Sequence, residues 1–264
     1  MNKKIVIILA GLAVIIAGIV GFNKFSSQKD AGLTIKKDTF TVGVEGTYAP
    51  FSFHDDKGNL TGFEVEIAEN LAKKMNMKVD FVQTKWDSLI AGVNAKRYDA
   101  VINNIGVSPE RKANYRMSDP YLYPRAALIK RTGDTSMNTL ADIKGKTMAQ
   151  SVTSNYGKRA KAEGANIKAV AGIIESMNLI TTNRADGTLN DLGSFENWKQ
   201  ANPDADVEAV DVAKEMGSTP DGVLMNKDNE ALQKKVNKAM KELHEDGTLS
   251  KLSKKYFNKD LTKE

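Results

Sequence analysis

The chain is dominated by two rounds of strand and helix alternation, one that begins at Phe40 and one that begins at Thr147. In the first round, apolar runs that predict strands at 39–44, 79–82 and 100–102 alternate with helical patterns at 63–75 and 86–93. This β-α-β-α-β order predicts an α/β sheet with parallel neighbouring strands. The second round repeats the pattern and stops near Pro220. The sequence therefore predicts two α/β units.

The last part of the chain predicts how the two units are connected. A strand at 222–225 and helices at 231–242 and 249–257 follow the second unit. The simplest topology lets the chain cross twice between two lobes, near Ile129 and near Pro220, and returns the closing helices to the first lobe. We therefore expect lobe 1 to contain residues 39–128 and 221–264, and lobe 2 to contain residues 129–220.

The N-terminus has the pattern of an export segment. Lys3 and Lys4 precede an unbroken apolar run from Ile5 to Gly21, and about 17 residues is long for a signal peptide and just enough to span a bilayer. The lysines are expected to stay in the cytoplasm, so that the rest of the chain is exported. No clear small-residue cleavage site follows, so residues 1–22 are predicted to be either a signal peptide or a membrane anchor. Residues 23–38 are polar and typical of a linker.

Charge and cysteine content restrict the classes of function that this chain can have. The formal net charge is +5, and residues 1–30 supply +3 of it through Lys3, Lys4, Lys24, Lys29 and Asp30. The remaining +2 is spread over a long chain, which argues against a nucleic-acid partner. The chain has no cysteine, which excludes lipid attachment through that residue and is compatible with an oxidising exterior.

No catalytic pattern is present in the sequence. The only histidines are His54 and His244, and no set of His and Cys residues has metal-ligand spacing. Phosphate-binding loops, nucleophile elbows and dinucleotide-binding glycine patterns are also missing. We therefore expect no catalytic residue, no metal and no cofactor.

Polar side chains follow the predicted strand at 100–102. The strand turns polar at Asn103 and Asn104, and Ser108-Pro109-Glu110 predicts a helix start, with Arg111 in its first turn. A guanidinium beside free backbone N–H groups is a good receptor for a carboxylate or a phosphate. The alternative is a surface arginine on an ordinary strand-loop-helix connection.

Other strand ends complete a receptor for a zwitterion. Ligands of α/β sheets bind outside the carboxyl ends of the strands, where the loop at 45–53 and Trp86 are also expected. Arg111 would bind a carboxylate and Asp191 an ammonium group. The rings of Tyr48, Phe51 and Trp86 would cover an apolar or cationic side chain. Asp191 could instead only cap the helix that begins near Ser194.

Seven segments then match a known pattern in order and spacing. They are GTYAPFSF at 46–53, LTGFEVEIA at 60–68, WDSLIAG at 86–92, YDAVINN at 98–104, SPERK at 108–112, SDPY at 118–121 and DGTLSKLSKKYF at 246–257. From Phe40 to Phe257 the chain resembles the extracellular solute-binding proteins of amino-acid ABC transporters, in the polar amino-acid group called family 3. The resemblance implies a two-lobed periplasmic-binding-protein-like fold of type II with two hinge strands. It also implies an exported monomer that closes on a free amino acid and delivers it to a membrane permease.

The resemblance also assigns roles by position. The family's carboxylate-binding arginine falls on Arg111 and its ammonium-binding aspartate on Asp191. The remaining contacts fall on Tyr48 as the ring over the ligand, Trp86 as a second wall, Asn103 and Asn104 as a strand-end pair, and Ser154 and Asn155 in lobe 2. Family members often carry Ser or Thr where this chain has Gly106, which keeps the amide but loses a hydroxyl. Asn103-Asn104 and the segment 188–191 are most similar to the cystine-type subgroup.

Two other functions remain as alternatives. Some relatives of this scaffold are dehydratases, and such an enzyme would need an acid or base in addition to Arg111 and Asp191, for which Glu45 is the only candidate. A ligand-sensing domain anchored by the N-terminal apolar run is the other alternative, and it usually requires a fused signalling domain.

Overall fold

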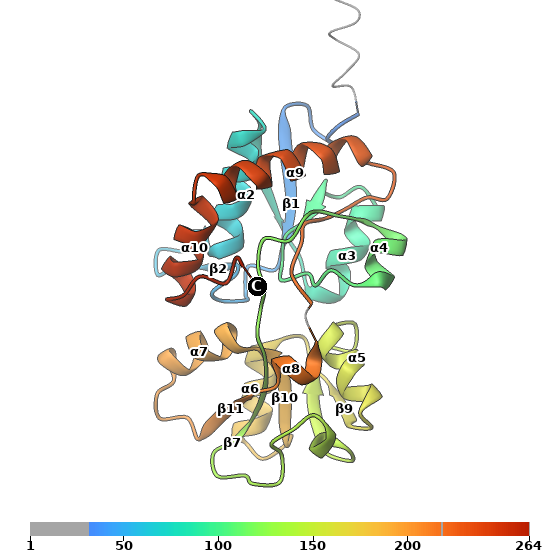
Figure 1. Cartoon of the computed structure of the whole chain (residues 1–264). Helices are drawn as coiled ribbons and strands as arrows, with labels where there is room; N and C mark the ends of the chain where they lie inside the picture. Colours follow the sequence, from blue (N-terminus) through green and yellow to red (C-terminus); the bar gives the residue numbers. More distant parts are fainter. Residues whose placement is uncertain (1–31, 218, 264) are drawn as a thin grey trace, which may run out of the picture.

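The computed structural model describes residues 32–217 and 219–263, and it divides into two lobes, one above the other in Figure 1. The predicted export segment at 1–22, and the linker up to residue 31, lie outside the described residues. Among the helices that are described, none combines the length and the apolar character that a membrane crossing requires.

Lobe 1, at the top of Figure 1, contains a five-stranded sheet in the order β4-β1-β5-β12-β6. The strands are β1 (Thr39–Val44), β4 (Lys78–Gln83), β5 (Ala100–Val101), β6 (Arg116–Met117) and β12 (Leu224–Met225). β1 pairs in parallel with β4 and β5, as predicted, whereas β12 is antiparallel to both β5 and β6. A hairpin of β2 (Phe53–His54) and β3 (Leu60–Thr61) follows β1.

Five helices cover this sheet. They are α2 (Phe63–Lys74), α3 (Trp86–Asn94), α4 (Pro109–Asn114), α9 (Glu230–Glu245) and α10 (Thr248–Phe257). The two closing helices, α9 and α10, pack on α2 (Figure 1).

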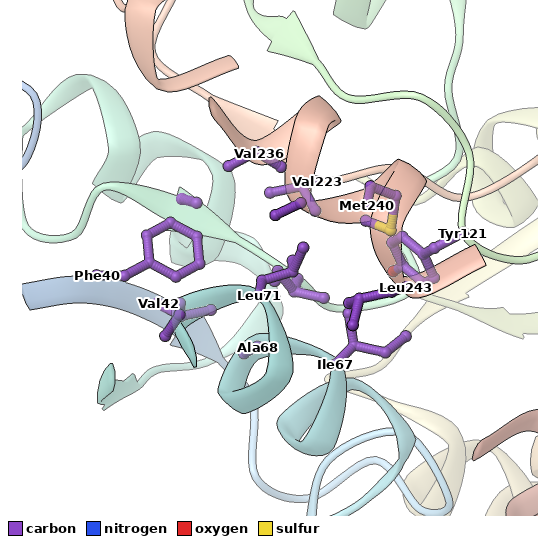
Figure 2. Close-up of a cluster of buried hydrophobic side chains, with 14 of the residues drawn as sticks. Phe40, Val42, Ile67, Ala68, Leu71, Tyr121, Val223, Val236, Met240 and Leu243 are labelled. Atoms are coloured by element: carbon purple, nitrogen blue, oxygen red, sulfur yellow. The ribbon is translucent and has the colours of Figure 1, made fainter. Parts of the chain in front are cut away.

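The core of lobe 1 shows why the closing helices return. Val236, Met240 and Leu243 recur on one face of α9 at helical spacing. In Figure 2 these side chains lie over Leu71 of α2 and Val42 of β1, and all five are fully buried. α9 therefore supplies part of the core of a lobe whose sheet begins about 200 residues earlier in the chain.

Lobe 2 repeats the architecture with its own sheet, in the order β11-β7-β10-β8-β9. The strands are β7 (Ala126–Arg131), β8 (Thr147–Gln150), β9 (Asn166–Ala169), β10 (Gly187–Asp191) and β11 (Val207–Asp211). Its helices are η1 (Ala141–Ile143), α5 (Asn155–Ala162), α6 (Ile173–Thr181), α7 (Leu192–Ala201) and α8 (Ala213–Met216). β8 is parallel to β9 and β10, and β7 is antiparallel to β10 and β11.

Two segments cross between the lobes, one between β6 and β7 and the other between β11 and β12 (Figure 1). They hydrogen-bond to each other, because the N–H of Asp221 donates to the carbonyl of Leu122 and the N–H of Tyr121 donates to the carbonyl of Asp221. The predicted pair of hinge segments is therefore present. β7 of the second sheet begins at Ala126, three residues before the predicted start of lobe 2 at residue 129.

The two lobes have separate cores. The buried clusters of lobe 2 gather around residues such as Ile129, Met177 and Leu189, and they share no buried member with the clusters of lobe 1. The half-buried ring of Tyr48, by contrast, packs against one buried cluster of each lobe. Each lobe can therefore move as a unit.

Candidate functional site

A cavity of about 760 Å³ lies between the lobes. Lobe 1 lines it with residues 45, 47–48, 83–86 and 104, and lobe 2 with residues 150–151, 154–156, 171–176, 178 and 189–190. These residues belong to or follow the carboxyl ends of β1, β4 and β5 in lobe 1 and of β8, β9 and β10 in lobe 2. The cavity is therefore where ligands of α/β sheets bind, and strand ends of both lobes meet there.

Five residues from the predicted site line this cavity: Tyr48, Trp86, Asn104, Ser154 and Asn155. Ser154 also accepts a hydrogen bond from the N–H of Gly157 at 2.9 Å, so its hydroxyl caps α5 at the cavity wall. Tyr48, Trp86 and Asn104 were expected here from the rule that ligands bind at the carboxyl ends of strands, which we call the strand-end rule. Ser154 and Asn155 were expected from the family resemblance.

Tyr48 spans the gap between the lobes. Its hydroxyl donates to Asn190 Oδ1 at 2.7 Å, and burial raises the pKa of its phenol well above the ordinary value. Its ring stacks on Phe51, with 5.1 Å between ring centroids and 19° between planes.

Phe51, which was predicted to cover the ligand, does not line the cavity. Phe51 is fully buried, and its ring lies 5.4 Å from that of Phe257 in the core of lobe 1. The Phe51 ring has no polar atom, so its burial in the core stabilises the fold at no cost in lost hydrogen bonds. Tyr48 has a hydroxyl, which it places at the cavity. Phe51 therefore supports Tyr48 from the core side.

Asn103 and Gly106 lie behind the cavity wall. Asn103 is fully buried and holds Glu45, because its Nδ2 donates to Glu45 Oε2 and its Oδ1 accepts from the Glu45 N–H, each at 2.8 Å. The carbonyl of Gly106 accepts from Arg111 Nη1 at 2.9 Å. A Cβ at Gly106 would come within 2.7 Å of Thr219 Cγ2, so the glycine makes room for the second crossing segment.

Arg111 stands beside the cavity and does not line it. The predicted helix start is confirmed, because Ser108 Oγ accepts from the Arg111 N–H at 3.2 Å and Pro109 opens α4. The guanidinium carbon lies 6.0 Å from the centroid of the Trp86 ring, which does line the cavity. Burial lowers the pKa of Arg111, against the influence of the Asp221 carboxylate.

Asp191 also stands one residue away from the cavity wall. It is only 3% exposed, and its Oδ1 accepts from the Ser194 N–H at 3.1 Å as the cap of α7. The alternative of a helix cap is therefore real, and the preceding residue, Asn190, lines the cavity. Burial raises the pKa of Asp191 to about 7, although N–H groups of α7 lower it.

The cavity wall also contains residues that were not predicted as ligand contacts, among them Asn190 and Glu45. Asn190 was named only within the segment 188–191, and Glu45 only as an acid or base for an enzyme. Both lie at the end of a parallel strand, so the strand-end rule could have found them. Burial raises the pKa of Glu45, and the hydrogen bond from Asn103 opposes that rise.

Direct contacts hold the two lobes together over the cavity. Asp87 Oδ1 at the start of α3 accepts from Thr153 Oγ1 at 2.7 Å and from Ser151 Oγ at 3.4 Å, and we call these contacts the interlobe latch. Lys158 Nζ and Glu110 Oε2 form an ion pair of 2.7 Å between α5 and α4. The two lobes therefore contact each other directly beside the cavity.

In the described part of the chain, no three His, Cys, Asp or Glu side chains are grouped so that they could hold a metal ion.

Comparisons with known proteins agree on one family. Residues 40–259 match the model of the bacterial extracellular solute-binding proteins, family 3. The L-cystine-binding protein TcyA of Bacillus subtilis (strain 168) is 42% identical over 86% of this chain and 84% of its own length. Among solved structures, an ancestral arginine-binding protein bound to arginine superposes with a TM-score of 0.78 at 31% identity, over 84% of this chain and 99% of that one.

A second solved structure indicates the arrangement of the lobes. The L-cystine solute receptor of Neisseria gonorrhoeae, in its unliganded open conformation, is 43% identical over 86% of this chain and 95% of its own, yet its TM-score is only 0.60. Since this identity exceeds that of the arginine-bound protein, the lobes here are arranged more like the bound relative. The family match and these relatives cover nearly all of the described chain, and the chain therefore belongs to the bacterial extracellular solute-binding proteins of family 3.

Proposed function

We propose that this protein binds a free amino acid between its lobes and delivers it to an ABC permease. The observation that carries the proposal is the cavity between the lobes, which both lobes line with polar groups and rings and which lies within the usual size of small-molecule sites. L-Cystine is the leading candidate ligand, because the relatives TcyA of Bacillus subtilis and TcyJ of Escherichia coli are named L-cystine-binding proteins. These names also favour binding over the dehydratase alternative.

We propose that Arg111 binds the ligand carboxylate and Asp191 its ammonium group. Both charges are largely buried, and neither forms an ion pair with a described residue. A buried charge without an ion-pair partner is costly, and a dipolar solute would supply both partners at once.

The remaining predicted residues would complete the pocket. Tyr48 and Trp86 would cover the ligand, and Asn104, Ser154 and Asn155 would offer hydrogen bonds from the two lobes. We propose that the protein acts as a monomer outside the cytoplasmic membrane, held by an N-terminal anchor or released after cleavage. N-terminal sequencing of the protein from its native cell would distinguish the two states.

Thermal unfolding in the presence of amino acids tests the function. A ligand that binds only the folded protein stabilises it by about 2.7 kcal/mol at a hundredfold excess over Kd, so the melting temperature should rise by several degrees. The screen should contain L-cystine and the common amino acids. A folded protein whose melting temperature none of them raises would contradict the proposal.

The interlobe latch should slow release of the ligand. Asp87→Ala removes the acceptor shared by Ser151 and Thr153, and the loss of such hydrogen bonds at an exposed position should raise koff about three- to tenfold. Thr153→Val should have a similar effect from the other lobe. Stopped-flow dissociation of L-cystine gives the rates, and the double variant should lose little more than either single variant. Fully additive effects would mean that the two side chains act separately.

A further inference from the structure

Two hydrogen-bond donors in the cavity wall have no partner. Trp86 Nε1 and Asn104 Nδ2 are both buried, and neither has a hydrogen-bond partner among the described residues. Both residues line the cavity between the lobes. Buried donors are almost always paired in folded proteins, so each unpaired one requires an explanation. Two in one cavity wall indicate an acceptor that binds there.

The local structure keeps the amide of Asn104 at the cavity. Asn104 follows β5 with φ at 48°, a left-handed conformation that asparagine tolerates better than most residues. Its backbone N–H donates to Glu64 Oε1 at 2.5 Å, and only 9% of the residue is exposed. The backbone is therefore fixed, and the side-chain amide is left without a partner at the wall.

Trp86 is held in a similar way on the neighbouring loop. It is the first residue of α3, directly after the connection from β4. The Arg111 guanidinium lies 6.0 Å from its ring centroid. A positive charge therefore stands next to the Trp86 ring, and a charge beside an unpaired N–H donor favours an anionic oxygen over a neutral one.

We propose that Trp86 is more than a covering ring, and that its indole N–H, together with the Asn104 amide, donates to the ligand carboxylate that Arg111 binds. This inference rests on the proposed function, and it adds the atoms that would select the ligand. A solute without the carboxylate would leave buried donors unpaired, which is the most effective way to reject a close analogue. Esters and decarboxylated amines should therefore bind poorly even when their side chain fits.

The chain offers a matched pair of variants for the test. It contains only two tryptophans, Trp86 and Trp198. Trp198 lies in α7 and does not line the cavity between the lobes. Trp86→Phe keeps a ring but removes the donor, and it should weaken L-cystine binding about tenfold or more. Trp198→Phe should leave the affinity unchanged, and circular dichroism would confirm that both variants fold.

A spectroscopic measurement separates a donor from a merely packed ring. In ¹⁵N-labelled protein the two indole N–H resonances are assigned with the two variants. Saturation with L-cystine should move the Trp86 resonance downfield, as expected for a new hydrogen bond to a carboxylate, and should leave the Trp198 resonance nearly in place. Asn104→Asp keeps the shape and the left-handed backbone but replaces the donor, so it should weaken binding at least as much as Trp86→Phe.

The outcomes are distinct. If L-cystine binds while the Trp86 resonance stays in place, or if Trp86→Phe binds as tightly as the wild type, the inference is overturned and the proposed function survives. If L-cystine dimethyl ester binds as tightly as L-cystine, the role of the carboxylate is overturned. If neither L-cystine nor any common amino acid binds the folded wild type, the proposed function fails and this inference fails with it.

Discussion

Arg111→Met should abolish amino-acid binding while the protein stays folded. Methionine keeps a long apolar stem against Trp86 but removes the largely buried charge that we assign to the ligand carboxylate. Loss of one partner of a buried charge pair costs about 2–5 kcal/mol, so Kd should rise about thirtyfold to several thousandfold. Isothermal titration with L-cystine measures the loss.

Arg111→Lys is the matched control for this variant. It keeps the positive charge but replaces the planar fork by a single ammonium, so it should retain weak binding. Arg111→Met also loses the hydrogen bond to the Gly106 carbonyl. Its ligand-free melting temperature, compared with that of the wild type, shows whether the variant stays folded. Wild-type affinity in a folded Arg111→Met protein would refute the assignment of the carboxylate.

Asp191→Asn should produce a loss of similar size for the ammonium group. Asparagine caps helices about as well as aspartate, so α7 should keep its cap while the negative charge is removed. We therefore expect Kd for L-cystine to rise about a hundredfold or more, with α7 intact by circular dichroism. Asp191→Ala, which loses both roles, should also be less stable than Asp191→Asn. Unchanged affinity in Asp191→Asn would mean that Asp191 is only a helix cap.

The raised pKa of Asp191 predicts how the stability of the ligand-free protein depends on pH. Burial raises the pKa of Asp191 from its ordinary 3.8 to about 7. The folded state then binds more protons than the unfolded state between these values, so stability falls as pH rises from about 4 to about 7. Asp191→Asn lacks this contribution and should be more stable than the wild type above pH 7, by about 2–4 kcal/mol. Urea unfolding at pH 5 and pH 8 measures the difference.

Ligand binding should reverse this protonation. An ammonium group beside Asp191 favours the carboxylate, so binding near pH 7 should release a proton, and affinity should fall as pH drops below 7. Titrations in buffers of different ionisation enthalpy detect the released proton. Asp191→Asn should show a smaller release.

Most of the helices and strands were predictable, because each of them has a hydrophobic periodicity that can be recognised in its own segment of the sequence. The strands at 39–44 and 79–82 and the helices near 63–75 and 231–242 were all found from their apolar patterns. The sequence does not determine which sheet the strand at Ala126 joins, because its apolar run is typical of a buried strand in either lobe. Two-residue strands such as β6 have no periodicity to read, and strand order depends on contacts that are distant in the sequence.

The site was predictable at the level of loops but not of side-chain direction. The strand-end rule placed Tyr48, Trp86 and Asn104 at one cavity. It could not tell that Phe51 turns into the core, because an aromatic ring in a loop can be a ligand cover or a support with equal ease. It also could not tell that Arg111 turns toward the Gly106 carbonyl, since rotamers depend on neighbours that the sequence does not place.

The path of the chain through the hinge has a consequence for evolution. All five strands of lobe 2 lie in one uninterrupted stretch, and the segments that enter and leave it are hydrogen-bonded neighbours at Leu122 and Asp221. A recombination event with two adjacent junctions could therefore exchange this entire cassette between related genes. The half of the pocket wall that lobe 2 supplies would be replaced in one step. The half that lobe 1 supplies would continue to bind the chemical group that the ligands share.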